Sequence, residues 1–303
     1  FDGYWQKGKP YLDAFEIIFI QDPVTSILAF ESGAAQLIMR IEPKAAKDLQ
    51  AKGYEILSIT YGSKSLTPDG ANADSPWSNR KAREALNYAI DRKAVSDAIG
   101  LGYWFPLYQA APEGYIGHFT DVESFRYDPA RAKKLLAEAG FPNGFSTTIL
   151  SKAEENHDLL VAIQTYLSDI GIKAKIELLD RGRYVANHKE GWHNGIMYGT
   201  FGGRPSEEKA SNLRIITTKM PYNKPVYSPP GFEETFDKAV GTWDPEEENR
   251  LTEKLYRMVY EESMIIPLWR ETQLAAQTKN VHDSGWCAVA STAWYPENAW
   301  LSK

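Results

Sequence analysis

The chain lacks the residue patterns that usually build covalent cross-links or metal sites. Its 303 residues contain a single cysteine, Cys287, so an internal disulfide cannot form. No histidine or basic residue directly flanks Cys287 to activate the thiol. The five histidines show no metal-ligand spacing, since even His188 and His193 are five residues apart and no HExxH occurs. We therefore predict no cofactor and no metal site.

Long apolar runs and clustered positive charge are also missing. No stretch of about 18 apolar residues occurs, so no membrane-spanning helix is predicted. The net charge is −6, and a basic cluster such as Arg131, Lys133 and Lys134 falls on a predicted helix, where it is better interpreted as a solvated face. No nucleic-acid partner is expected, because phosphate contacts need clustered lysine and arginine.

Signatures of common enzyme classes are absent as well. The sequence has no G-x-S-x-G and no Walker loop, and the G-L-G at residues 100–102 lacks the third glycine of a dinucleotide fingerprint. Residues 78–81 (SNRK) fit S-x-x-K, but no K-T-G follows, so they are better interpreted as a helix cap. We do not expect an enzyme. The scattered carboxylates leave one rival open, a hydrolase with a carboxylate pair in a cleft.

The chain does contain an alternation of predicted strands and helices, which favours an α/β fold. Predicted strands cover residues 15–20, 36–41, 54–61, 145–151, 172–179, 195–201 and 265–269. Predicted helices cover residues 24–32, 43–52, 155–170, 181–190, 237–240 and 246–260, besides those described next. Residues 62–78 are rich in glycine, serine, proline, aspartate and asparagine, which predicts a loop that crosses between two lobes.

The segment PWSNRKAREALNYAIDRKAVSDAIG carries strong helix signals. Ser78 or Asn79 can cap a helix whose apolar residues recur every three or four positions up to Ile90. Asp91 then opens a second short helix, which Gly100 closes. Two amphipathic helices in succession are therefore predicted.

A third helix follows an aromatic-rich loop, in the segment YDPARAKKLLAEAGF. Asp128 is its predicted cap, and Pro129 stands in the first turn, where a missing backbone N–H has no consequence. Ala132, Leu135 and the residues in register with them form the buried stripe, and Gly140 ends the helix.

These motifs resemble the family 5 extracellular solute-binding proteins, the large receptors of ABC importers for oligopeptides, dipeptides and nickel complexes. That family carries R-x-A-L-N-Y-A-I-D-R-x-A followed by Y-D-P-x-x-A-K-x-L-L-x-E-A-G, and residues 83–94 and 127–140 match these patterns. The opening FDGYWQKGKPYLDAF, residues 165–179 (TYLSDIGIKAKIELL) and residues 261–269 (EESMIIPLW) extend the resemblance over the whole chain.

The resemblance implies an α/β fold like that of periplasmic binding proteins, with two lobes of mixed sheet flanked by helices. Residues 1–66 and 270–303 would belong to lobe I, which would be incomplete, and residues 67–269 would form the α/β lobe that binds ligand. The hinge would lie near residues 62–70 and 267–272. Family members begin with a secretion signal and a long amino-terminal region, so we expect this sequence to be the carboxy-terminal portion of a longer protein.

The strand at residues 195–201 and the loop after it form the candidate ligand site. In peptide-binding relatives the matching strand pairs with the peptide main chain, and glycines at a strand end allow close approach. By resemblance, the candidate ligand-binding residues here are Tyr198, Gly199, Thr200, Phe201, Gly202 and Arg204. The alternative is that GGRP is only a turn.

The charge in this loop leaves the ligand class open. Oligopeptide receptors carry an aspartate just past the strand, which pairs with the peptide α-amine. Here Arg204 is the charged residue, and a guanidinium would favour a carboxylate or another anion. The run TFGGRP is also similar to T-W-G-A-P-Y in nickel-complex receptors.

Three further positions are candidates by resemblance. Tyr61 and Trp269 stand near the two expected hinges, and Arg181 stands at the start of a predicted helix, where relatives place groups that face the ligand. The alternatives are hinge packing for the two aromatic residues and a solvated charge for Arg181. Trp104 and Tyr108 could line the cleft or only cover a core edge.

The resemblance therefore implies a receptor that captures a peptide between two lobes and delivers it to ABC transporter permease subunits. It would act outside the cytoplasm, in a periplasm or as a cell-surface lipoprotein, and would be a monomer when complete. A nickel chelate or another small organic solute is the alternative ligand. A hydrolase, or a sensor whose lobes regulate a fused domain, would be the alternative class.

Overall fold

The computed structural model describes residues 3–201, 209–217, 224–286 and 296–303. The chain forms two compact units, each of which is described by itself. Unit 1 comprises Phe1–Tyr61, Ile99–Tyr103 and Glu271–Lys303, and unit 2 comprises Gly62–Ala98 and Trp104–Arg270. Within the described ranges, no helix is both long enough and apolar enough to cross a membrane.

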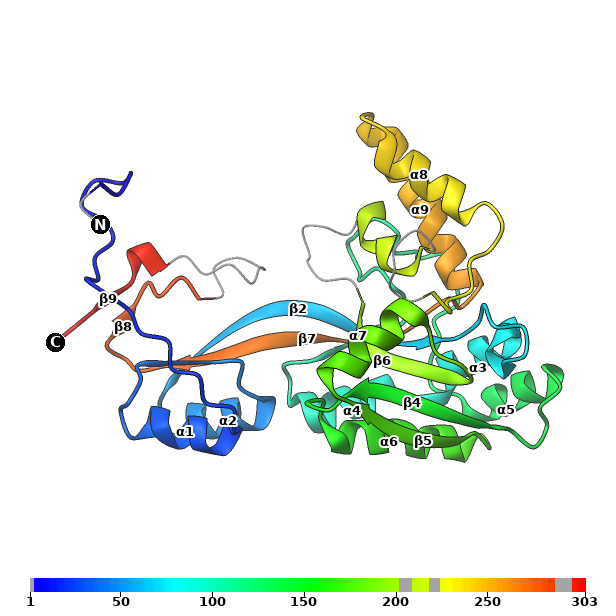
Figure 1. Ribbon diagram of the computed structural model, residues 1–303, viewed down its shortest axis with the longest axis horizontal. Coiled ribbons are helices and arrows are strands. Elements are labelled where there is room, and N and C mark those ends of the chain that lie inside the picture. Colours follow the sequence, from blue (N-terminus) through cyan, green and yellow to red (C-terminus); the bar gives the residue numbers. More distant parts are fainter. Residues whose placement is uncertain (1–2, 202–208, 218–223, 287–295) are drawn as a thin grey trace. The chain divides into compact units, whose positions relative to one another are not determined.

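Helices flank a mixed sheet, as the sequence predicts (Figure 1). The helices are α1 (Pro23–Glu31), α2 (Pro43–Ala51), α3 (Arg80–Ala89), α4 (Arg92–Gly100), α5 (Pro129–Glu138), α6 (His157–Asp169), α7 (Arg181–Glu190), α8 (Phe232–Gly241) and α9 (Pro245–Glu261). The strands are β1 (Leu37–Met39), β2 (Glu55–Pro68), β3 (Phe105–Pro106), β4 (Ser146–Lys152), β5 (Lys173–Leu179), β6 (Gly195–Phe201), β7 (Ile266–Gln277), β8 (Val281–His282) and β9 (Trp300–Leu301). The large sheet has the order β1-β7-β2-β6-β4-β5, with β3 beside β7, while β8 and β9 form a separate pair.

Unit 1 contains α1 and α2 with the short strand β1. The side chain of Asp22 caps α1 by accepting a hydrogen bond from the Thr25 N–H at 2.8 Å, and a proline occupies the first position of the helix. Phe30 of α1 and Leu49 of α2 are buried in a cluster that also includes Leu274 of β7. The predicted helices and the second predicted strand of this region are confirmed.

The strand predicted for residues 15–20 is wrong. This segment has no regular secondary structure, and its apolar side chains are exposed, with Phe15 at 56%, Ile18 at 54% and Phe19 at 90%. A strand requires a neighbour for its backbone hydrogen bonds, and no described strand pairs with this segment. An apolar run by itself therefore did not define a buried strand.

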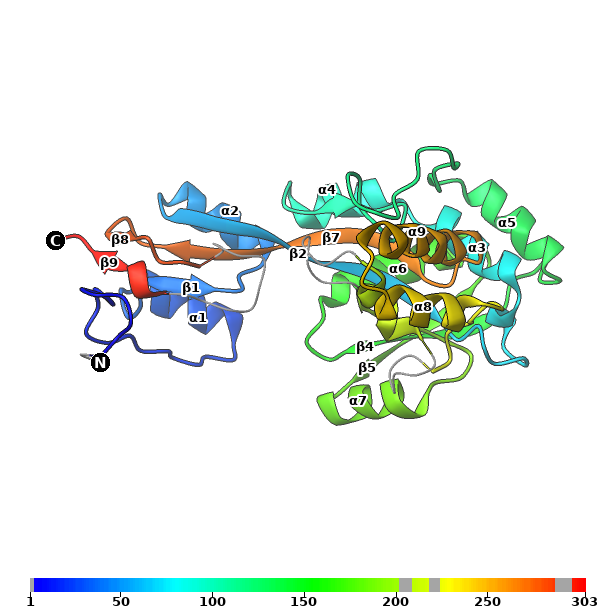
Figure 2. The same ribbon diagram turned by 90° about the horizontal axis from the view of Figure 1, so that it is seen from above.

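Unit 2 is built around β6, which lies between β2 and β4. β2 pairs with it antiparallel, and β4 pairs with it parallel while also pairing parallel with β5. α6 covers one face of β4 and β5, and α7 lies on the other face (Figures 1 and 2). The predicted strands in this unit and the helices at 155–170 and 181–190 are confirmed.

Two strands are longer than the sequence predicts. β2 continues to Pro68, so the predicted loop at residues 62–78 begins seven residues too early. β7 continues to Gln277 rather than ending at Trp269. The polar stretch of β2 becomes a strand because β6 and β7 pair with it on both sides, which buries Leu66 completely.

The three helices predicted between residues 79 and 139 are confirmed as α3, α4 and α5. Asn79 caps α3 by accepting from the Lys81 N–H at 2.9 Å, and Asp128 caps α5 by accepting from the Arg131 N–H at 2.9 Å. α3 packs directly against α5. Local capping chemistry therefore set the start of both helices.

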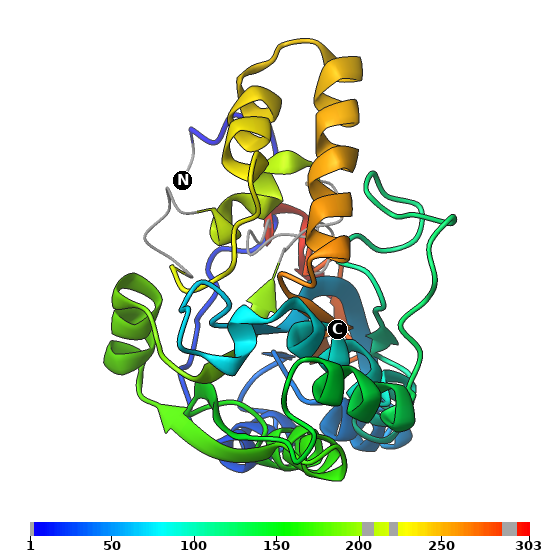
Figure 3. The ribbon, with the colours of Figure 1, turned by 90° about the vertical axis from the view of Figure 1, so that its right-hand side faces the viewer.

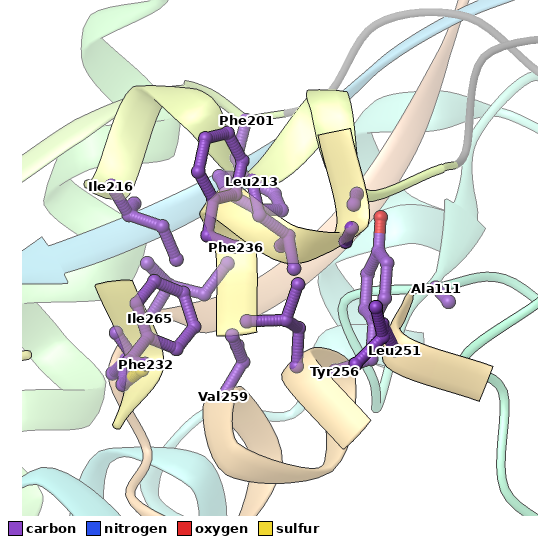
Figure 4. Close-up of a cluster of buried hydrophobic side chains, with 14 of the residues drawn as sticks. Ala111, Phe201, Leu213, Ile216, Phe232, Phe236, Leu251, Tyr256, Val259 and Ile265 are labelled. Carbon is purple, nitrogen blue, oxygen red and sulfur yellow. The ribbon is translucent and has the colours of Figure 1, made fainter. Parts of the chain in front are cut away.

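α8 and α9 form a helical hairpin that projects from the sheet of unit 2 (Figure 3). α8 begins at Phe232, five residues before the predicted start. The hairpin packs through a cluster in which Phe236 of α8, Leu251 of α9 and Phe201 of β6 are all buried (Figure 4). This cluster joins the hairpin to the end of β6 and so supports the candidate site.

Candidate functional site

The strand β4 runs beside only the first part of β6. β2 pairs with β6 from Ile196 to Phe201, but β4 pairs with it only from Gly195 to Met197. No other described strand pairs with residues 198–201 on the β4 side. The structure therefore offers a row of backbone groups at the end of a parallel strand, where α/β sheets usually bind ligands.

Asp69 fixes the start of β6. Its carboxylate, which is fully buried, accepts hydrogen bonds from the backbone N–H of Asn194 at 2.7 Å and of Gly195 at 3.3 Å. It also accepts from the Ser75 hydroxyl at 2.8 Å and from the Asn72 amide at 2.9 Å. One side chain thus holds the turn after β2 and the first residues of β6 together, which sets the register of the open edge.

Gly199 lies next to the hydroxyl of Tyr184 of α7. A Cβ atom at this position would lie 2.9 Å from Tyr184 Oη, which is closer than real Cβ atoms approach other atoms. The absence of a side chain therefore lets the Tyr184 hydroxyl approach the strand backbone closely.

A partly buried ion pair stands beside the edge. Lys64 of β2 is paired with Thr200 in the sheet register, and its Nζ lies 2.9 and 3.1 Å from the two carboxylate oxygens of Glu155. The two side chains are only 11% and 17% exposed. Lys64 Nζ also lies 5.2 Å from the ring centroid of Tyr198, within the range of a cation–π contact. A positive charge, on Lys64, and a negative charge, on Glu155, therefore lie close to the edge of β6.

Tyr184 is held in a low-dielectric position beside this pair. Burial, and to a lesser extent the nearby Glu155 carboxylate, raise the pKa of Tyr184 to about 12. Lys152 Nζ lies 4.9 Å from its ring centroid, and the ring of His188 packs edge-on against it at 4.4 Å. The phenol is therefore a neutral hydrogen-bond donor and acceptor at physiological pH.

An aromatic cluster lies under the edge. Trp104 and Trp269 stack with centroids 5.9 Å apart and ring planes 9° from parallel, and Tyr198 lies 6.3 Å from Trp269. Trp269 and Tyr198 are fully buried. The indole N–H of Trp269 has no hydrogen-bond acceptor among the described residues. We refer to Trp104, Trp269 and Tyr198 as the buried floor, because their packed rings support the strand from below.

The structure places the predicted site residues in different environments. Thr200 is exposed, Tyr198 and Trp269 belong to the buried floor, and Phe201 points into the hydrophobic cluster of the hairpin. Arg181 is exposed at the first position of α7.

Three other predicted residues cannot be placed in this way. Tyr61 lies within β2 at the boundary of unit 1, and its side chain is outside the described part. Gly202 and Arg204 also lie outside the described residues.

Sequence reasoning missed Lys64, Glu155 and Tyr184. Lys64 was assigned to a loop, and only strand pairing brings it to Glu155, which is 91 residues away in the chain. Glu155 carried a usable signal, because it closely follows the carboxyl end of a predicted strand. Tyr184 stands one helical turn after the start of a helix whose position was correctly predicted.

Unit 1 has a cavity of its own, with a volume of about 490 Å³. It contains none of the residues at the edge of β6. Its lining residues are Tyr11, Glu55, Leu57, Gln277, Asp283, Ser284, Gly285, Trp286 and Asn298. No group of three or more potential metal ligands occurs among the residues that the structure describes.

Comparison with known families gives a clear match. Residues 1–220 match the family of bacterial extracellular solute-binding proteins, family 5, in its middle region. The glutathione-binding protein GsiB of Salmonella paratyphi A is 31% identical over 299 residues, which cover 93% of this chain and 57% of that protein. GsiB of Escherichia coli K12 is 31% identical over 317 residues, covering 99% of this chain and 60% of that protein. The chain thus spans less than two thirds of these relatives.

Solved structures with the same fold bind different solutes. The periplasmic binding protein DppA from Helicobacter pylori, in complex with the peptide STSA, aligns with a TM-score of 0.80 and 22% identity over 94% of this chain and 56% of that protein. AgaA from A. tumefaciens R10, in complex with agropinic acid, aligns with a TM-score of 0.78 and 26% identity over the whole chain and 63% of that protein. NikA from Brucella suis, in complex with Fe(III)-EDTA, aligns with a TM-score of 0.74 and 18% identity over 87% of this chain and 57% of that protein. These alignments confirm the predicted fold class.

Proposed function

Because the chain belongs to the bacterial extracellular solute-binding proteins of family 5, we propose that it forms the ligand-binding part of an ABC-importer receptor. The receptor would capture a short peptide outside the cytoplasm and deliver it to a membrane permease. Its relatives are named as binding proteins, which supports binding without turnover. The proposal covers the periplasmic and the lipid-anchored form of such a receptor alike.

The observation that carries this proposal is the side of β6 along which β4 pairing stops at Met197. β2 already holds the opposite edge of residues 198–201, so these backbone groups are fixed in an extended conformation. A peptide in extended form can pair with such an edge, because its main chain supplies matching donors and acceptors whatever its side chains are. A rigid strand on a packed floor also reduces the entropy that is lost on binding.

The charged groups beside the edge suit the two ends of a short peptide. The Lys64 ammonium group lies beside the β6 edge, and its positive charge would attract a peptide carboxylate. Glu155 can accept from a peptide ammonium group, and Tyr184 can donate from its neutral hydroxyl. We further propose that Arg204 contributes a second carboxylate contact. Thr200 and Gly199 would contribute mainly through their backbone groups.

A small anionic organic solute is the second candidate. Lys64 lies beside Tyr198 of β6 and Lys152 lies beside Tyr184 of α7, and two cations in this region favour a ligand with more than one carboxylate. AgaA, at 26% identity, is described in complex with an organic acid, agropinic acid. A nickel chelate stays a third candidate, because NikA shares the fold.

The experiment that identifies the ligand is mass spectrometry of solutes released by denaturation from the complete natural protein. Peptide masses would support a peptide as the ligand. A single organic acid would instead support the small anionic solute, and a nickel isotope pattern would support the nickel chelate. A solute that is chemically altered during incubation with the protein would contradict binding without turnover and revive the hydrolase alternative.

Strand addition can be tested by calorimetry with a tripeptide and its N-methylated forms. N-methylation removes one backbone donor, so methylation at a nitrogen that pairs with β6 should weaken binding roughly five- to tenfold, the equivalent of one hydrogen bond. Methylation at the adjacent nitrogen, which points away from the strand, is the matched control. Equal affinity of all forms would contradict pairing with β6.

A further inference from the structure

The turn between α8 and α9 exposes a large apolar side chain. Trp243 is 100% exposed, the highest value among the large apolar side chains in the described ranges, and Val240 beside it is 50% exposed. The rest of the hairpin buries its apolar face well, since Phe236 and Leu251 are both about 5% exposed in the shared cluster (Figure 4). The exposed indole is therefore a local feature of the turn and not a sign of poor packing.

The hydrogen bonds that form this turn do not involve the side chain of Trp243. Asp244 caps α9 by accepting from the Glu246 N–H at 3.0 Å, and the Thr242 hydroxyl accepts from the Asp244 N–H at 3.2 Å. The residue before a helix cap often packs against the fourth helical residue as a hydrophobic staple. Here that fourth residue is Glu248, which offers no apolar partner. The turn is complete without the indole.

Negative charge surrounds this exposed aromatic residue. Residues 233–250 contain seven aspartate and glutamate side chains but only two cations, in a chain whose net charge is −6. Three of the acids, Glu246, Glu247 and Glu248, occupy the first turn of α9 directly beside Trp243. Glu247 pairs with Arg250 and Glu248 pairs with Lys209, so the tip of the hairpin is an apolar group beside a net excess of negative charge.

This combination selects one kind of partner. Tryptophan is among the residues most enriched at the centres of protein interfaces, where surrounding charged residues exclude water. An acidic surface is repelled by anionic lipid headgroups and attracted by basic protein surfaces, which also accelerates association. A partner that fits must carry an apolar socket bordered by lysine or arginine.

We propose that the hairpin tip, formed by Val240, Trp243 and the carboxylates of the first turn of α9, docks into a basic socket on the external face of the permease. This inference rests on the proposed function, because a receptor must contact its permease to deliver a solute. The tip belongs to α8 and α9, whereas the candidate ligand site belongs to β6, β2 and α7. Docking and ligand binding are therefore separable by mutation.

The test uses the complete receptor and the purified permease pair in nanodiscs of neutral lipid. Stimulation of permease ATPase activity is measured against receptor concentration, and ligand affinity is measured separately by calorimetry. Trp243→Ala should leave ligand affinity within about twofold, while the receptor concentration for half-maximal stimulation should rise about tenfold or more. Trp243→Phe should recover most of this loss, because it restores an aromatic group of similar shape.

Charge is tested by reversing one acid at the tip. Glu246→Lys should weaken stimulation and reduce its dependence on salt, because it removes attraction to a basic socket. Glu253→Lys is the matched control, since Glu253 is an exposed acid on α9 outside its first turn. Equal effects of the two variants would contradict a socket that recognises the tip.

Other outcomes separate the docking inference from the proposed function. Unchanged half-maximal stimulation with Trp243→Ala would overturn the docking inference alone, and so would flotation of the receptor with permease-free vesicles that depends on Trp243. A wild-type receptor that binds solute but never stimulates the permease would also overturn docking. A wild-type receptor that binds no solute at all would instead overturn the proposed function and the inference with it.

Discussion

Lys64 Nζ lies 2.9 Å from a carboxylate oxygen of Glu155 across a gap of 91 residues in the chain. β2 carries the lysine and the loop after β4 carries the glutamate, so the pair forms only when β6 is in place between the two strands. Both side chains are mostly removed from water. Paired charges at low dielectric beside an open strand edge are typical of a recognition site rather than of a stability device.

Removal of one partner should destabilise the protein more than removal of both. Glu155→Leu leaves the Lys64 charge partly buried without its carboxylate, so the free energy of unfolding should fall by ~2 kcal/mol. Lys64→Met combined with Glu155→Leu should recover part of this loss. These variants form a double-mutant cycle. Urea denaturation of wild type, Lys64→Met, Glu155→Leu and the double variant measures the coupling energy between the two side chains.

The exposed pair of Lys93 and Asp97 is the matched control for this cycle. Its coupling energy should be below about 0.5 kcal/mol, the usual value for surface pairs. If the coupling of Lys64 with Glu155 were equally small, the pair would be screened by water and would lose its assigned role.

Lys64 should also recognise a carboxylate on the ligand. Lys64→Met should weaken binding of a peptide with a free carboxy terminus by about tenfold, and binding of the same peptide amidated by much less. Calorimetry with both peptides measures the difference. The surface substitution Lys93→Met controls for loss of net charge, and an equal loss for both peptides would refute the assignment.

Asp69 should be essential for the start of β6. Asp69→Ala leaves the N–H groups of Asn194 and Gly195 without their acceptor and breaks a network around a fully buried carboxylate, so the free energy of unfolding should fall by ~3 kcal/mol. Asp74→Ala, which changes an exposed aspartate five residues away, should have an effect below about 0.5 kcal/mol. Similar effects of the two variants would mean that the network around Asp69 is not formed in solution.

Gly199→Ala tests access to the strand edge. The new Cβ atom would lie 2.9 Å from Tyr184 Oη, so the tyrosine must move, and we expect weaker ligand binding with little loss of stability. The double variant Gly199→Ala/Tyr184→Phe removes the clashing hydroxyl and should bind better than Gly199→Ala alone. Calorimetry and thermal unfolding compare the three variants. A double variant no better than the single one would exclude this contact as the cause.

Tyr184 should make stability depend on alkaline pH. Its pKa is raised to about 12 in the folded protein, from about 10 in an unfolded chain. In the folded protein Tyr184 therefore stays protonated to a higher pH than in the unfolded chain. The resulting contribution to the free energy of unfolding is complete below pH 10 and is lost as the pH rises toward 12. The difference of about two pKa units corresponds to about 2–3 kcal/mol of stability, and Tyr184→Phe should remove that part of the decline.

The measurement is urea denaturation of wild type and Tyr184→Phe between pH 9 and 12, from about one unit below the unfolded pKa up to the folded pKa. Tyr88 also has its pKa raised to about 12 by burial, so the wild-type curve alone is not diagnostic. The difference between the two curves isolates Tyr184, and Tyr11→Phe at an exposed site controls for loss of a hydroxyl. Parallel curves for wild type and Tyr184→Phe would contradict the burial of this phenol.

Trp269→Ala should be a poor probe of ligand binding, because the side chain is fully buried and stacked on Trp104. We expect the free energy of unfolding to fall by ~3–5 kcal/mol. Trp269→Phe should lose much less, since the indole N–H has no acceptor among the described residues and only packing changes. Chemical denaturation of both variants tests this, and a small effect of the alanine variant would show that the indole is not part of the core.

Local chemistry made most helices predictable. Asn79 and Asp128 cap their helices as the sequence indicates, and Gly140 adopts a left-handed backbone with φ of 93° at the end of the third helix. These signals act over three or four residues and need no knowledge of the rest of the fold. The strands of unit 2 were predictable for a similar reason, because turns and helices bound their apolar runs.

Features that depend on distant partners were not predictable. Residues 15–20 have the composition of a buried strand, but no described strand runs beside them. Residues 62–68 look like a loop but are held in the sheet by β6 and β7. The candidate site likewise contains some residues that were predictable from the sequence and one contact that was not. Gly199 and its strand followed from the sequence, but the contact of Lys64 with Glu155 depends on the strand order, which no local pattern specifies.

The side of β6 beyond the end of the β4 ladder could promote aggregation as well as ligand binding. Backbone groups that accept the main chain of a solute would also accept the strand edge of another copy, which is a common route to aggregation. The mixed charges of Lys64, Glu155 and Lys152 limit this, because an apolar strand from another copy would have to desolvate them. The groups proposed to select a ligand would thus also act as gatekeepers that keep the protein soluble at high concentration.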